Sequence, residues 1–259
     1  INNPLPAAGE RSAESIIEVK NNALAYFQAQ QRAVTKEDYI TRVYALPPKY
    51  GNIAKSYVVQ DSQLDSKAGA SPEDRIANPL ALNMYLLGYD ANKKLSTVNQ
   101  AVKENVQTYL TQFRMVTDAV NITDAFVINI GVKFNILAKV GYNNEEIVLK
   151  AIQVVRDFFN IDKWQINQPI VIADLAYQIS LVDGVSSIVA PEDDNPKKLP
   201  VVITNKFAVG SGYSGNAYDI VSATRDGIVY PSLDPSCFEL KFPNTDIEGR
   251  IVGSSEGGN

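Results

Sequence analysis

The chain has 259 residues, of which 45% are hydrophobic, and a net charge of −5 from 24 basic and 29 acidic residues. This composition is ordinary for one or two globular domains, and the mild acidity argues against nucleic acid or an anionic membrane as the main partner, because both attract a basic face. No run of about 18 apolar residues is present, so no transmembrane helix is predicted.

Residue types that carry enzyme chemistry are scarce. The chain has no histidine, which removes the commonest general base, the commonest metal ligand and every Ser-His or Cys-His nucleophile system. The single cysteine, Cys237, excludes an internal disulfide framework and indicates a small packing residue in a protein of reducing, cytosolic origin. Ile1 stands where an initiator Met would, and no signal peptide follows, which indicates a processed chain or a fragment. We therefore expect no catalytic, cofactor-binding or metal-binding residue.

The N-terminal part of the chain is predicted to be helical. Residues 14–32 have an apolar side at helical spacing and are expected to form a first helix. Thr35 starts a second helix: its hydroxyl can accept from a free backbone N–H of the first turn, and Asp38 can reach back three residues. The Pro47-Pro48 pair must end this helix.

Two strands and a helix are predicted next. Ile53–Gln60 alternates apolar and polar residues, as a strand does, and Ala81–Tyr89 is expected to be the returning strand. The polar stretch Asp61–Pro79 between them is a long loop, and loops of this length are functional or mobile. Thr97 is predicted to cap a helix that extends to about Phe113.

The clearest strand pattern is Asp124–Ile136. Every second residue from Phe126 to Ile136 is apolar, whereas the residues between them, such as Asn129 and Lys133, are mostly polar. Strict alternation predicts one packed face and one wetter face, and hence an antiparallel or mixed sheet that helices cover on one side.

The last third of the chain is predicted to pass from helices to short strands. Asn143, with Glu146 three residues on, caps a helix that extends to about Asn160. A further helix is expected at Val171–Leu181, and Gly184-Val185 leads into a strand that ends before Pro191. The remaining β segments are short: Val201–Thr204, Ile228–Tyr230 and Phe238–Phe242. Residues Ser254–Asn259 are expected to be frayed.

These elements predict an α+β fold with mixed or antiparallel sheets packed with helices, plus a β/loop-rich C-terminal region. We divide the chain into a helical N-terminal segment, 1–50, an α/β core, 51–190, and the C-terminal region, 191–259. The core could consist of two subdomains that meet near residues 118–124.

One segment, Gly210–Gly215, matches the dinucleotide fingerprint G-x-G-x-x-G. That motif binds a pyrophosphate only where it follows a strand and opens a helix. The residues after it have weak helical periodicity and soon meet Gly227 and Pro231, so a glycine-rich loop is favoured. A nucleotide-binding enzyme that uses this loop remains an alternative.

The other polar motifs have ordinary explanations. Glu192-Asp193-Asp194 lacks the spacing of a calcium-binding loop, and Glu145-Glu146 suits the first turn of a helix. Asn121-Ile122-Thr123 is a glycosylation sequon, and we interpret it as a chance match because no signal peptide is visible. A surface-binding, adhesin-like module that uses Asp61–Pro79 is a further alternative, although the paired cysteines that would favour it are missing.

A family resemblance rests on several short motifs in a fixed order. The octet Arg32-Ala-Val-Thr-Lys-Glu-Asp-Tyr39 resembles a signature of the baseplate-J-like family of contractile phage tails. Residues 8–15 resemble the family's Gly-Gly-x-x-x-Glu-Ser entry to the first helix, with Glu10 where the second glycine is usual. Pro169–Val189 is similar to the family's closing helix and "GV" strand. The likeness covers about residues 5–190 and is strongest to the C-terminal part of the wedge proteins of T4-type phages.

The resemblance implies a structural role and no enzymatic activity. It implies a wedge component present in two copies per wedge, homodimer contacts through this part of the chain, and a continuous ring around the tail hub that rearranges when the sheath contracts. The implied partners are a second copy and other baseplate wedge proteins, with no nucleic acid, membrane or small-molecule substrate. The implied location is the virion tail baseplate, assembled in the host cytoplasm. Residues from Pro200 onward match no family motif.

Overall fold

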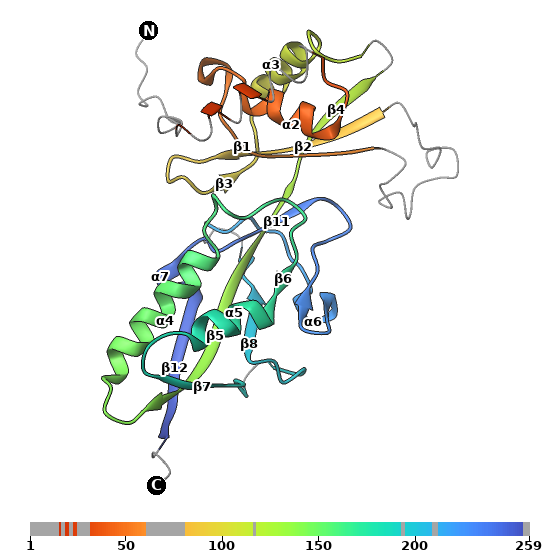
Figure 1. The fold of residues 1–259 in the computed structure, drawn as a ribbon. Coiled ribbons are helices and arrows are strands. Elements are labelled where there is room, and N and C mark those ends of the chain that lie inside the picture. The colour runs from red at the N-terminus through yellow and green to blue at the C-terminus, as the bar shows by residue number, and fades with distance from the viewer. Residues whose placement is uncertain are drawn as a thin grey trace. The chain divides into compact units, whose positions relative to one another are not determined.

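The structure, a computed structural model, describes residues 32–60, 81–115, 118–192, 195–208 and 212–255. It also describes five positions between residues 16 and 24, and all five are helical. Most of the predicted helix 14–32, the motif at residues 8–15 and the loop Asp61–Pro79 lie outside the described residues. The described elements form the predicted α+β fold, with helices packed on mixed sheets (Figure 1).

The chain divides into two compact units. Unit 1 comprises Ile1–Ala125 together with Leu233–Pro235, and unit 2 comprises Phe126–Ser232 and Ser236–Asn259. Residues 51–190 therefore contribute to both units. The three-segment division drawn from the sequence remains a prediction.

Unit 1 contains a four-stranded sheet around one central strand. The central strand β2 (Ala81–Tyr89) pairs antiparallel with β1 (Ile53–Gln60) and with the short β3 (Leu95–Ser96). It pairs parallel with β4 (Ala119–Asp124). The strands predicted at 53–60 and 81–89 are confirmed with the same bounds. The parallel partner makes this sheet mixed.

Two helices pack on this sheet, α2 (Lys36–Tyr44) and α3 (Gln100–Leu110), and a 3-10 helix, η1 (Pro48–Tyr50), follows α2. The predicted start and stop of α2 are confirmed, because Thr35 caps it and it ends before Pro47. Buried apolar side chains from both helices and three strands form one core: Tyr39, Val43, Val58, Met84, Leu86, Val106, Leu110 and Val120.

The start of α3 differs from the prediction. Asn99, not Thr97, is the N-cap, and its Oδ1 accepts from the backbone N–H of Ala101 at 3.2 Å. Thr97 follows β3 outside the helix, and the N–H of Val98 donates to the Asp124 carboxylate. The helix therefore begins two residues later than the capping pattern indicated, because a residue distant in sequence takes the amide before it.

The sheet of unit 2 is built around one long strand, β5 (Phe126–Lys139). On one side it pairs parallel with β11 (Ser236–Glu239) and β12 (Ile247–Ser255). On the other side it pairs antiparallel with β8 (Val201–Asn205) and β7 (Val185–Val189). Figure 1 shows β12, in dark blue, running beside the yellow-green β5.

The strand predicted at Asp124–Ile136 is two strands, since β4 ends at Asp124 and β5 begins at Phe126. From Val132 to Ala138 fully buried and half-buried residues alternate, as predicted. The earlier part of β5 differs: Phe126 is 47% exposed, whereas Asn129 is fully buried. The segment after β8 covers Asn129, and the backbone N–H groups of Lys206 and Ser214 donate to its oxygens.

Two helices cover one face of this sheet. α4 (Asn144–Phe158) packs against β12 and β5, and α5 (Ile172–Ser180) packs against β7 and β8. Asn143 caps α4, as predicted, by accepting from the N–H of Glu145 at 3.0 Å. The buried helix residues occur at helical spacing: Ile147, Ala151, Val155, Ile172, Leu175 and Ile179.

The C-terminal part of the chain has more order than the sequence indicated. β6 (Ile170–Val171), β9 (Thr224–Arg225) and β10 (Ile228–Val229) form a small antiparallel sheet, next to the short helix α6 (Ile220–Ala223). A second short helix, α7 (Pro243–Asp246), precedes β12. The prediction that Ser254–Asn259 is frayed is wrong for its first two residues, because Ser254 and Ser255 pair with Ala138 and Lys139. Residues 256–259 lie outside the described residues.

Candidate functional site

The octet Arg32–Tyr39, which carries the family resemblance, contains the capped N-terminus of helix α2 in unit 1. The Asp38 carboxylate accepts from the N–H groups of Val34 at 3.0 Å and Thr35 at 2.9 Å, and its own N–H donates to Thr35 Oγ1. Burial raises the pKa of the Asp38 carboxyl, but the hydrogen bonds from Thr35 and Val34 outweigh burial and hold the pKa below its usual value. Tyr39, which is buried, donates its hydroxyl proton to Asp118 at 2.8 Å. These groups are occupied in helix capping and core packing.

The described part of the glycine-rich motif is a loop tied to β5. Gly212 and Gly215 have positive φ angles, and Gly210 and Ser211 lie outside the described residues. Ser214 donates its N–H to Asn129 Oδ1 and its hydroxyl to the carbonyl of Val127, each at 2.7 Å. The next helix is the four-residue α6. A dinucleotide site needs a longer helix that opens directly at the glycines, and residues 212–223 do not supply one.

The remaining motifs are held in structural contacts. Cys237 is buried with its sulfur 3.7 Å from the carbonyl of Gln165, and Asn121 donates from its side chain to Asn83. Glu146 pairs with Lys150 one helical turn later, and the hydrogen bond from that lysine lowers the pKa of the Glu146 carboxyl.

Asp193 and Asp194 of the acidic triplet lie outside the described residues, as does the loop Asp61–Pro79. Within the described ranges, no group of three or more His, Cys, Asp or Glu side chains is placed to hold a metal ion. The same part of the chain contains no helix that is long and apolar enough to cross a membrane.

The described residues of unit 2 form at least two hollows. A shallow groove of about 590 Å³ lies between α4 and α5, and its lining is mainly apolar: Val154, Phe158, Asp174, Tyr177, Gln178 and Leu181. A second hollow of about 20 Å³ has room for roughly one water molecule. Lys197 borders this second hollow and donates to the carbonyls of Val221 and Thr224. Neither hollow brings together an acid, a base and a nucleophile.

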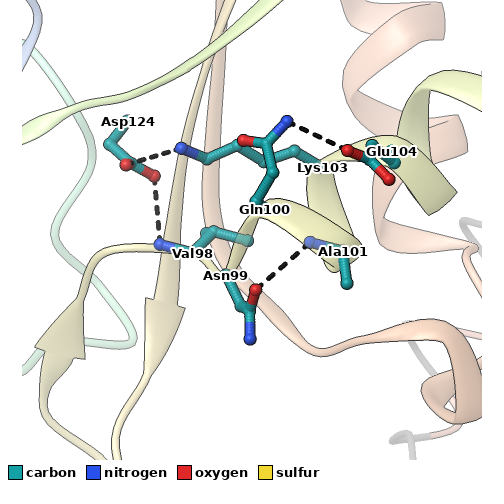
Figure 2. A network of polar contacts seen from close by, with 7 residues as sticks. All are labelled: Val98, Asn99, Gln100, Ala101, Lys103, Glu104 and Asp124. Atoms are coloured by element: carbon teal, nitrogen blue, oxygen red, sulfur yellow. Dashed lines mark hydrogen bonds and ion pairs between the residues drawn. The ribbon is translucent and has the colours of Figure 1, made fainter.

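A partly buried polar cluster of unit 1 lies at the end of β4, and we call Asp124, Val98 and Lys103 the Asp124 anchor. Figure 2 shows both carboxylate oxygens of Asp124 in use. Oδ1 accepts from the backbone N–H of Val98 at 3.0 Å, and Oδ2 accepts from Lys103 Nζ at 2.7 Å. The side chains of Lys103 and Asp124 are only 16% and 26% exposed, so solvent screens this ion pair less than a pair on an open surface.

The anchor joins three elements of unit 1. Val98 comes just before α3, and Lys103 lies in the first turn of that helix, so one carboxylate binds both the approach to the helix and the helix itself. The next residue, Ala125, is buried and donates its N–H to the carbonyl of Leu86 in β2 at 3.1 Å. Asp124 and Ala125 are therefore fixed to α3 and β2, respectively.

This position matters because unit 1 passes into unit 2 here. β4 ends at Asp124 and β5 begins at Phe126, which leaves Ala125 as the only residue between the two strands. The arrangement holds backbone in place, and both oxygens of the carboxylate already accept hydrogen bonds.

Sequence reasoning missed this cluster, although it placed Asp124 at the boundary of the predicted strand Asp124–Ile136. That boundary agrees with the preference of aspartate, which is unfavourable within strands. Nothing in the sequence pairs Asp124 with Lys103, because that contact depends on how α3 packs.

Comparison with known proteins gives a likeness of fold. No protein-family model and no curated protein sequence matches the chain. Among 17 chains of solved structures that match is one from the anti-feeding prophage (AFP) baseplate, determined by electron cryomicroscopy with 6-fold symmetrisation. The match covers 91% of this chain at a TM-score of 0.51 and 13% sequence identity. The chain spans 44% of that neighbour's length. At this identity the likeness establishes a shared fold that includes both units.

Proposed function

We propose that this chain is a structural, non-enzymatic part of the baseplate of a contractile tail. The observation that carries the proposal is the fold match to a chain of the anti-feeding prophage baseplate, which extends over 91% of the sequence. The chemistry of the described residues agrees with it. Asp38, Asp118 and Asp124 all accept hydrogen bonds within unit 1, and the glycine-rich loop is tied to β5.

The finer proposal assigns the chain to the baseplate-J-like family as a wedge component. In that role it forms homodimers, contacts other wedge proteins and links neighbouring wedges into a ring around the hub within the virion. The ordered motifs from Arg32 to Val189 support this assignment. When the sheath contracts, the ring changes shape, and folded units joined by short connections would keep their internal structure while the angles between subunits change.

Particle assembly tests the baseplate role directly. The gene would be deleted from the genome that encodes the tail, and particles would be examined by negative-stain electron microscopy. We expect baseplates to be missing and to return when the full-length gene is supplied in trans. An antibody or gold label on the restored protein should mark the baseplate end of the tail. Complete, contractile tails without this protein would overturn the proposal.

Nucleotide binding is a useful contrast, because an assembly subunit should not require it. We expect the melting temperature of the purified chain to be unchanged by millimolar ATP, GTP or NAD, since a ligand that binds only the folded state raises it. A rise that the substitution Ser214→Ala abolishes would favour the nucleotide-binding enzyme. Ser214→Ala removes a hydroxyl of the glycine-rich loop and leaves the glycines in place.

A further inference from the structure

The strand β12 forms an edge of the unit 2 sheet. It pairs with β5 on one side, and no described strand pairs with its other side. Burial agrees with an open edge. Phe134 and Ile136 of β5 are fully buried, whereas Gly249 and Ile251, which pair with them, are only half-buried. An open edge presents backbone N–H and C=O groups that can bind another strand.

The sequence of this edge is complementary to itself. Residues 247–251 read Ile-Glu-Gly-Arg-Ile, with a glycine at the centre, opposite charges on either side of it and isoleucine at both ends. In antiparallel pairing about a two-fold axis at Gly249, Glu248 of each copy faces Arg250 of the other. Opposite charges directly across an antiparallel pair stabilise it, and a two-fold interface requires this reciprocity.

The two charged side chains are placed where a second strand could meet them. The side chains of Glu248 and Arg250 are 37% and 69% exposed. Glu248 lies 4.0 Å from Arg250 and 4.0 Å from Lys133 of β5. Exposed ion pairs at this separation contribute little, so new pairs across a dimer axis would replace weak ones.

Local backbone features limit the pairing to this segment. The register of β12 with β5 shifts between Ile251 and Gly253, so the regular part of the strand ends at Ile251. Bulges and charges on an edge normally prevent indiscriminate pairing, and here they leave one short segment with one favoured register. Gly249 has no side chain to obstruct the axis, and a Cβ there would lie 2.7 Å from Phe134 Cζ.

We infer that the outer edge of β12 is a homodimer seam, at which a second copy of this chain pairs antiparallel about Gly249. This inference rests on the homodimer in the proposed function and adds the segment, the direction and the register of the contact. A five-residue strand contact is at the weak end of specific interfaces, so the dimer should be sought at roughly 50 µM chain.

Charge exchange tests the seam in the full-length chain. Glu248→Arg or Arg250→Glu alone places like charges opposite each other twice, and each should raise the dimer dissociation constant about tenfold or more in sedimentation equilibrium. The double variant Glu248→Arg/Arg250→Glu restores complementarity and should recover the dimer. Arg225→Glu, a charge reversal at an exposed position on β9, is the matched control and should change nothing. Circular dichroism checks that every variant is folded.

Disulfide trapping tests the register. Facing residues of an antiparallel pair have Cα atoms about 5 Å apart, within the range of a disulfide. An equimolar mixture of Glu248→Cys and Arg250→Cys chains should give a disulfide-linked dimer on mild oxidation. Each variant alone should give little, because identical positions then lie diagonally across the axis. The native Cys237 is buried and should not interfere.

The outcomes separate the seam from the rest of the proposal. A wild-type dimer that is insensitive to both single exchanges overturns the seam and leaves the homodimer intact. A wild-type monomer at roughly 50 µM overturns the seam and the homodimer together. The baseplate role is judged independently, by the particle assembly of the deletion strain.

Discussion

β4 and β5 follow each other with one residue between them, yet they occupy opposite kinds of position. β4 is short, has β2 as its strand partner and alternates exposed and more buried residues. β5 has four strand partners and is buried along most of its length. Their polar residues differ accordingly: Asp124 of β4 is partly exposed in an ion pair, whereas Asn129 of β5 is fully buried beside a buried glutamate. Position in a sheet, more than local sequence, decides what each side chain contributes.

Truncating an apolar residue on each strand should show the largest contrast. Phe134→Ala removes a fully buried ring from β5 and should lower the free energy of unfolding of unit 2 by about 4 kcal/mol. Ile122→Ala, at a half-buried position of β4, should cost unit 1 about 1.5 kcal/mol. The single tryptophan, Trp164, belongs to unit 2, so urea denaturation followed by its fluorescence should detect only the first change. Equal effects of the two variants on that fluorescence transition would contradict the contrast.

The buried amide of β5 should give the next largest effect. Asn129 donates to Glu239 Oε2 at 2.9 Å and accepts from the Ser214 N–H at 2.7 Å. Asn129→Leu removes this partner of the Glu239 carboxylate and of the Ser214 N–H inside the protein. It should lower the free energy of unfolding in denaturant by about 3 kcal/mol. Asn135→Ala, at a half-buried position of the same strand, is the control and should cost less than about 0.5 kcal/mol. If the two variants were equally stable, Asn129 would not hold the covering segment on β5.

The Asp124 anchor should be weaker, because it is partly exposed. Asp124→Ala removes the acceptor of the Val98 N–H and the partner of Lys103, and should cost about 1.5 kcal/mol. Lys103→Met removes only the ion pair and should cost about 0.5 kcal/mol. Hydrogen exchange at the Val98 amide separates the two variants, since only Asp124→Ala should speed it markedly. Glu104→Gln, on the exposed side of α3, serves as the control.

A pH effect should be absent near neutral pH and appear only under alkaline conditions, and it occurs in both units. Burial, aided by the bond to Asp246, raises the pKa of Tyr213 to about 12. Burial and the bond to Asp118 likewise raise the pKa of Tyr39 in unit 1. Because each pKa in the folded state lies above the unfolded value of about 10, the stabilisation is complete below pH 10 and is lost as pH rises through the folded value.

The substitution Tyr213→Phe or Tyr39→Phe should make the free energy of unfolding of its unit fall less steeply as the pH rises. Urea unfolding at several values between about pH 8 and pH 12 would measure it, with Trp164 fluorescence for unit 2 and hydrogen exchange in α3 for unit 1. An unchanged slope in Tyr213→Phe would show that this hydroxyl does not titrate differently in the folded protein.

The sequence predicted elements whose signals are local. Thr35 and Asp38 identified the start of α2, and apolar alternation identified β1 and the half of β5 that carries Val132 and Phe134. The predictions were wrong where residues distant in sequence determine the local structure. The Asp124 carboxylate accepts from the N–H of Val98, and α3 begins two residues later than predicted. The segment that contains Ser214 buries Asn129, which lies on the face of β5 that was predicted to be more exposed to solvent. The anchor and the edge of β12 are products of packing and pairing, and periodicity carries no information about either.

The pairing pattern of β5 also has a consequence in time. Most of unit 1 comes from the chain before Phe126, so its sheet can close early during synthesis. β5 cannot complete its sheet at that stage, because its parallel neighbours are synthesised much later. Asn129 and Glu239 are 110 positions apart, and β12 comes later still. Contacts this distant in sequence form slowly, and an uncovered apolar strand is prone to misassociation in the interval. We expect nascent or truncated chains that end before residue 236 to need chaperones far more than the complete chain does.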